Sequence, residues 1–348
     1  MQDHVRTWLR QRTSHWQDWP PERLLAAKRA AGTRISVVIP ARNEERTVGR
    51  VVAALRQALL TATPLVDEII VVDSDSTDGT ARAAERAGAV VHRARDIAPA
   101  LGSYPGKGEA LWKSLLVTRG DLLVFVDADL TRWGPHFVTG LLGPLLADPP
   151  GAGQREVGRQ RDGQQEVGQQ RGGQRGVGRR GDGQQVQLVK GFYERVRTER
   201  DGSTSTEGGR VTELVARPLL SLWWPQLAGV VQPLAGEWAI RRGLMESLSI
   251  PVGYGVELST LLDTFTQYGL GALAQVDLGS RAHRHQADHD LALMAAELLV
   301  VAEARREHPE PPGQLLHQFV RENGEARPRS RAIPSHERPP ASTVKAVQ

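Results

Sequence analysis

The chain has 348 residues, of which 40% are hydrophobic and 24% are charged, values typical of a soluble globular protein with one large domain or two medium ones. It contains no cysteine, which excludes a disulfide framework, a thiolate zinc site and a cysteine nucleophile. The formal net charge is +4, but residues 151–185 alone hold seven arginines against four acidic residues. The basic charge therefore gives little support for a nucleic-acid-binding fold.

The N-terminal region, residues 1–34, is expected to be an arm that packs on the main domain through its three tryptophans, at positions 8, 16 and 19. Its first residues include three arginines and lack the apolar core of a secretory signal. No apolar run in the chain approaches the about 18–20 residues that span a bilayer. We therefore expect a cytoplasmic protein without a membrane partner.

Residues 35–150 alternate short apolar runs with helical patterns. The apolar runs predict strands over 35–39, 68–72, 89–92 and 122–126, with helices over 48–59, 78–87 and 108–117 between them. This alternation predicts an α/β fold with a doubly wound, mostly parallel sheet and right-handed crossovers. Ligands of such sheets bind outside the carboxyl ends of the strands, so the polar residues that follow each strand are the candidate site.

A low-complexity insert interrupts this pattern at residues 151–186. Glycine recurs at every fifth position from Gly153 to Gly183, and the residues between are mostly Gln, Arg and Asp. So few apolar residues cannot offset the entropy of the chain, and we expect a disordered surface loop. RNA binding through this insert is the non-enzymatic alternative, but the insert has no aromatic residue for base stacking, so nucleic acid is not an expected partner.

Regular patterns resume in residues 187–310. They predict strands over 187–193 and 273–278, a helix over 210–224, a helix that follows a turn at 251–255, and a last helix over 288–306. Residues 311–348 are rich in Pro, Arg and Ser, and we expect them to form a disordered tail.

Polar segments follow three of the four strands predicted in residues 35–150, namely the first, the second and the fourth. Asp127 and Asp129 come directly after the strand over 122–126, and their carboxylates suit a hard divalent cation. The segments 40–45 and 73–80 close the first two strands. An isolated Asp-x-Asp is a weak signal, but three polar segments at one edge of the sheet indicate a nucleotide and metal site.

Two predicted helix starts suit anionic groups. Lys107 stands between two glycines at the first, where backbone N–H groups and an ammonium favour a nucleotide. Arg210 and Thr212 stand at the second, which favours an oxyanion. The histidine-rich segment 281–285 fits no common zinc spacing, so we expect one of its histidines to join the carboxylate site.

The segments 35–45, 72–80 and 126–130 resemble nucleotide-sugar-dependent glycosyltransferases of the GT-A fold. Longer blocks at 105–112, 209–219, 232–234 and 253–257 resemble the actinobacterial glucosyl-3-phosphoglycerate synthase family. The resemblance covers about residues 7–300 without the insert. It makes residues 35–150 the nucleotide-sugar-binding half, with the donor at the carboxyl ends of the strands, and residues 187–310 the acceptor-binding half.

The resemblance implies transfer of glucose from UDP-glucose to the 2-hydroxyl of 3-phosphoglycerate with retention, by a homodimer that uses Mg²⁺ or Mn²⁺. Asp129 and His283 would bind the metal, and the implied catalytic residues are Asp127, Asp129, Lys107 and Glu257. The donor would contact Pro40, Ala41, Arg42, Glu44, Ser74, Lys107, Asp127, Ala128, Tyr254, Glu257 and Arg281. The acceptor would contact Gly209, Arg210, Val211, Thr212 and His285.

Three positions depart from the family pattern. Ala128 replaces the usual serine between the aspartates, Asp75 stands where glycine is common, and His285 stands where asparagine is common. His285 would lie near the acceptor, so this difference bears on which acceptor is preferred.

Two other transferase activities are alternatives to this function. A mannosyl donor with the same acceptor is the nearest rival, and a polyprenyl-phosphate glycosyltransferase shares the motifs at the strand ends. The lack of membrane segments and Arg210 at a helix start count against the latter. No carboxylate nucleophile is identifiable, so front-face displacement is favoured over a covalent glycosyl intermediate.

Overall fold

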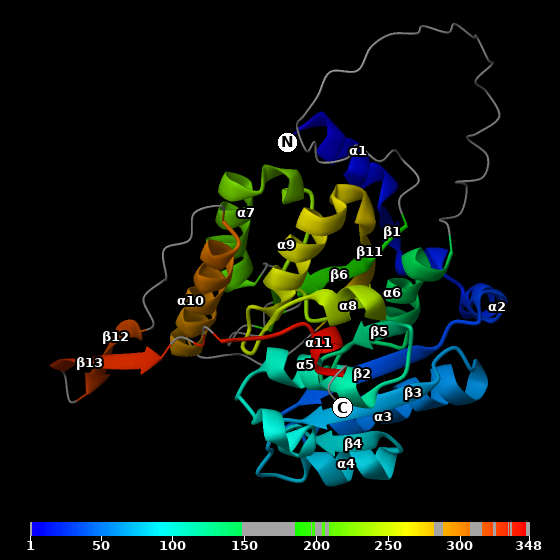
Figure 1. The fold of residues 1–348 in the computed structure, drawn as a ribbon, viewed down its shortest axis with the longest axis horizontal. Coiled ribbons are helices and arrows are strands. Elements are labelled where there is room, and N and C mark those ends of the chain that lie inside the picture. The colour runs from blue at the N-terminus through cyan, green and yellow to red at the C-terminus, as the bar shows by residue number, and fades with distance from the viewer. Residues whose placement is uncertain are drawn as a thin grey trace, which may run out of the picture.

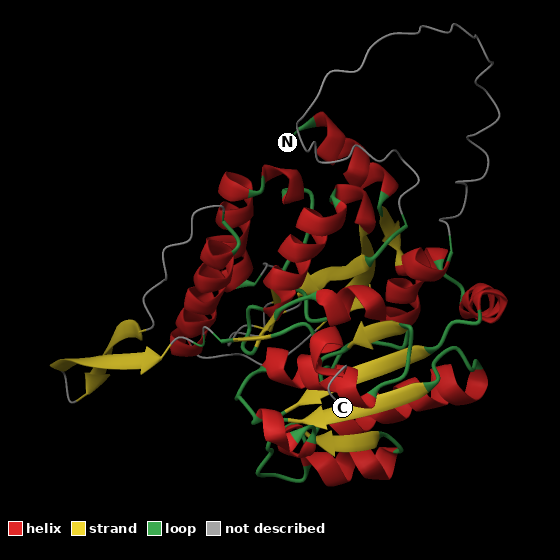
Figure 2. Ribbon diagram, viewed as in Figure 1, coloured by secondary structure: helices red, strands yellow, loops and turns green. Residues whose placement is uncertain are grey.

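The computed structural model describes residues 2–147, 185–195, 197–198, 204–205, 209–281, 288–306, 315–322, 325–332, 334 and 336–345. Its centre is an eight-stranded sheet with helices on both faces (Figures 1 and 2). The strands lie in the order β1 (Thr13–His15), β11 (Leu273–Arg281), β6 (Leu188–Arg195), β9 (Trp238–Arg241), β5 (Leu122–Phe125), β2 (Ile35–Ala41), β3 (Glu68–Asp73) and β4 (Val90–Arg93). The predicted α/β fold with a mostly parallel sheet is confirmed.

Strand β9 is antiparallel to both of its neighbours, β5 and β6. This strand was not predicted, because four residues give no periodic signal. From β2 the chain moves outward to β3 and β4, and it then returns to place β5 on the other side of β2. This reversal makes the carboxyl ends of β2 and β5 the topological switch point of the sheet, which is where such sheets bind ligands.

Alternation along the central strands divides the core into two clusters, one on each face of the sheet. Val37 and Val124 belong to one cluster with helices α3 and α6, and Val38 and Phe125 belong to the other with α5 and α9. This division follows from the two-residue period of a strand that is buried on both faces. The helices are α1 (Asp3–Gln11), α2 (Pro21–Ala31), α3 (Val48–Leu55), α4 (Thr80–Ala87), α5 (Lys107–Val117), α6 (His136–Leu146), α7 (Arg217–Trp223), α8 (Arg242–Ser247), α9 (Val256–Tyr268), α10 (Asp288–Ala304) and α11 (Ala341–Lys345).

Two helices are continuous with π-helical turns. Residues Arg56–Ala62 extend α3, and residues Thr212–Ala216 precede α7. In the parts of the chain that the structure describes, no helix combines the length and the apolar character needed to cross a membrane.

The N-terminal arm packs on the sheet through its tryptophans, as predicted. The indole of Trp8 donates a hydrogen bond to the Leu273 carbonyl oxygen at 3.0 Å, and Trp19 is almost fully buried. The arm also supplies β1, which pairs with β11. The predicted domain boundaries remain a prediction, and the predicted disordered insert lies outside the described residues except for its last two positions.

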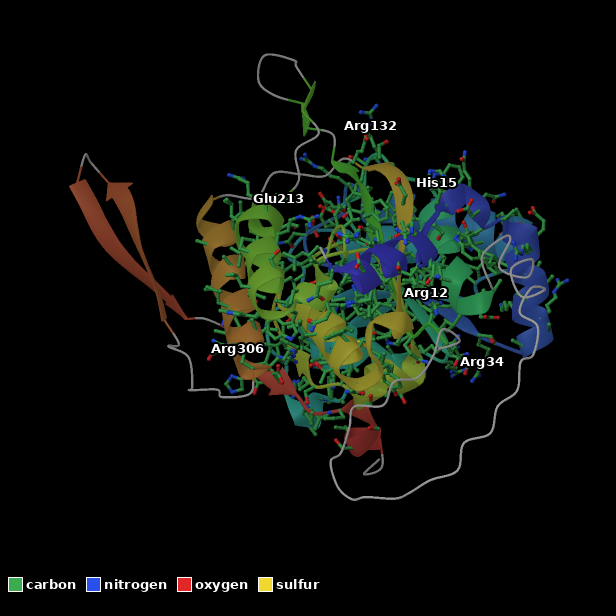
Figure 3. The ribbon with its side chains drawn as sticks, turned by 90° about the horizontal axis from the view of Figure 1, so that it is seen from above. Arg12, His15, Arg34, Arg132, Glu213 and Arg306 are labelled. Carbon is green, nitrogen blue, oxygen red and sulfur yellow. The ribbon has the colours of Figure 1, made fainter. Side chains whose placement is uncertain are left out.

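The C-terminal region, residues 311–348, contains regular structure where disorder was expected. Strands β12 (Leu315–Glu322) and β13 (Glu325–Ala332) form a hairpin, and β14 (Glu337–Arg338) pairs with β10 (Ile250–Pro251) before α11 begins. Figures 1 and 3 show the hairpin standing away from the body of the molecule. The expectation is therefore wrong for these residues. A buried arginine and a two-residue strand order the segment 336–345, and neither leaves a periodic pattern in the sequence.

Close backbone packing at Gly108 leads to a stability prediction. The Gly108 amide donates to the Gly253 carbonyl oxygen at 3.1 Å, and a Cβ atom at Gly108 would lie 1.7 Å from the Pro251 carbonyl oxygen. Gly108→Ala is expected to destabilise the protein by about 1–3 kcal/mol, because the backbone must move apart. Gly243→Ala on α8 is the control, since no atom lies within 4 Å of its Cβ position. Thermal unfolding measures both, and equal melting temperatures would contradict the prediction.

Candidate active site

An acidic and basic cluster lies just beyond the carboxyl end of β5. The Lys107 ammonium contacts Asp127 Oδ1 and Glu257 Oε1, both at 2.7 Å. Arg281, the last residue of β11, places Nη2 3.0 Å from Asp127 Oδ2 and 3.3 Å from Asp129 Oδ1. The start of α5, the loop after β5, the start of α9 and the end of β11 therefore meet at one place, although they are far apart in the sequence.

Arg281 is fixed from its other side by two residues that the sequence analysis missed. Its Nη1 lies 2.7 Å from Glu237 Oε2 and donates to the Tyr193 hydroxyl at 2.5 Å. Glu237 is fully buried and precedes β9, and Tyr193 lies on β6. The neighbouring Gly236 admits this packing, because a Cβ atom there would lie 2.3 Å from Asp127 Oδ2. Glu237 follows the family-like block 232–234 by three residues, and only that proximity could have pointed to it.

The two aspartates of the cluster differ in their electrostatics. Burial disfavours the charge of Asp127, but Lys107 and Arg281 prevail and hold its pKa below that of an ordinary aspartate. Burial and the charge of Asp127 raise the pKa of Asp129. Both carboxylate oxygens of Asp127 are therefore paired, whereas the ion pair of Asp129 within the described part of the chain is its 3.3 Å contact with Arg281.

The chemistry of Asp129 fits a divalent cation. A carboxylate oxygen whose contact with the Arg281 guanidinium is as long as 3.3 Å can also coordinate a hard cation, which prefers oxygen ligands and also accepts oxygens from phosphate. The described residues contain no group of three potential protein ligands. His283 and His285 fall in residues 282–287, outside the described part of the chain, so their predicted roles remain predictions.

The ends of β2 and β3 form a second wall of the site. The Ser74 amide donates to the Ala41 carbonyl oxygen at 2.8 Å, and the Glu44 amide donates to Thr80 Oγ1 at 2.7 Å. Asn43 stands in the left-handed region with a φ of 58°, and its side chain accepts a hydrogen bond from the Thr77 amide. These contacts hold together the two loops that contain the predicted donor residues Pro40, Ala41, Arg42, Glu44 and Ser74.

The remaining predicted residues lie on other elements. Ala128 is buried, and Tyr254 precedes α9 with a side chain that is 40% exposed. Gly209, Arg210, Val211 and Thr212 open the helical segment that continues into α7, where Glu213 donates its amide to the Gly209 carbonyl oxygen. Figure 3 shows α7 beside α10, with Glu213 near one end of this pair of helices and Arg306 at the other.

Lys190 is a buried cation on β6 that the sequence analysis also missed. Its ammonium donates to the Ala235 carbonyl oxygen at 2.9 Å, and burial lowers its pKa from 10.5 to about 7. In the unfolded chain Lys190 keeps the ordinary pKa of 10.5, so between pH 7 and 10.5 the unfolded state binds more protons than the folded state. The buried lysine therefore destabilises the folded protein more as the pH falls through this window. Lys190→Met is therefore expected to gain stability relative to wild type from pH 10 to pH 7. Urea unfolding at several pH values measures the free energy of unfolding of both proteins. A difference between them that does not change with pH would contradict the prediction.

Comparison with known proteins supports the resemblance found in the sequence. The model of the glycosyl transferase family 2 matches residues 36–200. The glucosyl-3-phosphoglycerate synthase of Mycolicibacterium smegmatis is 40% identical over 338 residues, which cover 97% of this chain and 98% of that protein. The chain belongs to the glucosyl-3-phosphoglycerate synthase family.

Solved structures of the family superimpose on this chain along nearly its whole length. The Mycobacterium tuberculosis glucosyl-3-phosphoglycerate synthase with Mn²⁺, UDP-glucose and phosphoglyceric acid is 39% identical with a TM-score of 0.76, covering 96% of this chain and 99% of that one. The same enzyme with Mg²⁺ and UDP gives the same identity, TM-score and coverage. The fold that the sequence predicts is thus that of the glucosyl-3-phosphoglycerate synthases.

Proposed function

We propose that the protein transfers glucose from UDP-glucose to the 2-hydroxyl of 3-phosphoglycerate with retention, giving glucosyl-3-phosphoglycerate. The observation that carries this proposal is the cluster of Lys107, Asp127 and Arg281, which joins three distant segments beyond the carboxyl end of β5. A doubly wound sheet binds nucleotides at this switch point. The family membership and the ligands named for its solved structures support the same substrates.

The donor would lie with its uridine against the ends of β2 and β3 and its diphosphate at the charged cluster. There Lys107 and Arg281 present two cations to the oxygens that become negative when UDP leaves. Glu257 holds Lys107 in place, and Glu237 and Tyr193 hold Arg281. Because these charges are fixed before the reaction, little reorganisation is needed in the transition state.

Mg²⁺ or Mn²⁺, held by Asp129 and His283, would supply Lewis-acid stabilisation of the departing UDP. Asp127 would position Lys107 and Arg281, because each of its two carboxylate oxygens contacts one of these cations.

The transfer step is proposed as a front-face displacement. The anomeric carbon loses its bond to the diphosphate oxygen while the acceptor 2-hydroxyl oxygen bonds to it on the same face. The hydroxyl proton passes to the diphosphate oxygen that leaves. Glu237 is not suited to act as the nucleophile of a covalent alternative, because it is fully buried and paired with Arg281.

The acceptor would bind at the start of the helical segment that continues into α7. Backbone N–H groups and Arg210 at a helix start favour a phosphate, and 3-phosphoglycerate carries a phosphate and a carboxylate. His285 would add to this site. We also propose a homodimer, as the family resemblance implies, and light scattering of the purified protein tests it.

A donor and acceptor screen tests the proposed function. The purified protein with Mg²⁺ or Mn²⁺ would be given UDP-glucose, ADP-glucose or GDP-mannose, each with 3-phosphoglycerate, glycerate or no acceptor, and nucleotide release would be measured. We expect fast release only with UDP-glucose and 3-phosphoglycerate together. Higher turnover with GDP-mannose would instead favour a mannosyl-3-phosphoglycerate synthase.

A further inference from the structure

The loop that presents Lys107 has little regular structure of its own. Residues 102–106 lie between a short 3₁₀ turn and α5, and Gly102 and Gly106 have φ values of 67° and 141°. Tyr104 and Pro105 are exposed. Such a segment gains few internal contacts, so the position of Lys107 depends on ties from elsewhere in the chain.

Arg338 provides these ties. Its guanidinium pairs with both oxygens of Glu109 at 2.9 and 2.8 Å, and Glu109 lies two residues after Lys107 on α5. Nη1 and Nη2 also donate to the carbonyl oxygens of Leu101 and Gly102 at 2.8 and 3.2 Å. Both ends of the Lys107 loop are therefore bound to one buried side chain. A fork of several N–H donors is needed for this, which arginine has and lysine lacks.

The aromatic residues of the loop and helix close around the same guanidinium. Its central carbon lies 4.7 Å from the Tyr104 ring and 4.9 Å from the Trp112 ring. The Trp112 indole donates to the Pro339 carbonyl oxygen at 2.9 Å. Figure 1 shows α11, which follows, beside α5 and α8.

The same segment, residues 336–345, also contacts β10, the strand that precedes α9. We call it the C-terminal strap. Its His336 carbonyl oxygen accepts a hydrogen bond from the Val252 amide at 3.2 Å, and β14 pairs with β10. Strand β10 leads directly into the turn with Tyr254 and into α9 with Glu257. The strap therefore binds both segments whose side chains meet in the Lys107–Glu257 ion pair.

We infer that Arg338 is a positioning residue for the nucleotide-sugar site, acting through Glu109 and the Lys107 loop. This inference rests on the proposed function only in that Lys107 contacts the donor. The loss of Arg338 would free the loop and misplace the Lys107 ammonium, and a shift of about 1 Å in a positioned group can change rates by about a hundredfold. The acceptor site at residues 209–212 lies on another element and would keep its affinity.

The test compares Arg338→Met and Arg338→Lys with Arg242→Met. Arg242 is a matched control, because it binds the other end of α5 through the Leu115 carbonyl oxygen at 3.2 Å and Thr118 Oγ1 at 2.7 Å. We expect Arg338→Met to raise the KM for UDP-glucose about tenfold or more and to leave the KM for 3-phosphoglycerate within about twofold. Arg338→Lys should lie between Arg338→Met and wild type. Arg242→Met should lower the melting temperature without changing either KM.

Several results would overturn the inference. One is an unchanged KM for UDP-glucose in Arg338→Met, and another is an equal rise in Arg242→Met, which would indicate general destabilisation. If Arg338→Met does not fold, Arg338→Lys decides the question by the same comparison of the two KM values. A wild-type protein that does not transfer glucose from UDP-glucose would contradict the proposed function instead. The strap is then tested by whether UDP binding, measured by calorimetry, weakens in the Arg338 variants.

Discussion

Asp129→Ala is expected to reduce glucose transfer by about two to three orders of magnitude. The substitution removes the carboxylate that we propose as a direct metal ligand, and metal stabilisation of a leaving phosphate contributes several kcal/mol. Asp127 keeps its own contact with Arg281 at 3.0 Å, so the cluster retains its other ion pairs. Steady-state kinetics over a range of Mn²⁺ concentrations measures the loss. Added EDTA should reduce wild-type activity to the same extent.

Asp121→Ala is the control for this prediction. Asp121 lies at the other end of β5 and is half exposed, where its Oδ2 accepts a hydrogen bond from the Arg34 amide. Its replacement should change stability slightly and leave the metal dependence as in wild type. Full wild-type activity in EDTA, together with an active Asp129→Ala variant, would refute the metal assignment.

Arg210→Ala is expected to raise the KM for 3-phosphoglycerate by about ten- to a hundredfold. A hydrogen bond to a charged ligand contributes about 1.5–3 kcal/mol, and the helix start adds its own attraction for the phosphate. The KM for UDP-glucose should change little, because the donor is proposed to bind at the strand ends. Wild-type protein should prefer 3-phosphoglycerate over glycerate, and the variant should lose most of that preference.

Arg306→Ala is the matched control for Arg210→Ala. Arg306 is a partly exposed cation that lies 4.6 Å over the ring of Trp223, at the far end of α7 (Figure 3). The Arg306→Ala substitution removes one positive charge, as Arg210→Ala does, but next to the far end of α7. It does not change the proposed phosphate site. An equal rise in the acceptor KM for both variants would point to long-range electrostatics. A loss of donor affinity in Arg210→Ala would move the acceptor site elsewhere.

The sheet could be predicted from the sequence where its strands are buried on both faces. Strands β2, β3 and β5 appear as continuous apolar runs, and their order along the chain with helices between them indicates the parallel sheet. Strand β9 and the C-terminal strap could not be predicted this way. They are ordered by pairing with distant strands and by the ion pair of Arg338 with Glu109, which are tertiary interactions.

The residues of the site likewise divide into those that could be predicted from the sequence and those that could not. Lys107, Asp127 and Arg281 could be named from motifs and from the family resemblance, and the structure brings them together. Glu237 and Tyr193 could not be named, because their role is to fix Arg281 from behind, and that contact joins β6, β9 and β11 only after the sheet has formed. A residue that acts through another residue leaves no spacing pattern in the sequence.

The product of a single reaction tests the proposed glucosyl transfer. Wild-type protein, Mn²⁺, UDP-glucose and 3-phosphoglycerate would be incubated together, and the product would be analysed by mass spectrometry and NMR. We expect one glucose on the 2-oxygen of 3-phosphoglycerate, with the same anomeric configuration as in the donor, in an amount equal to the UDP released. Release of UDP with only free glucose, or a product of inverted configuration, would contradict it.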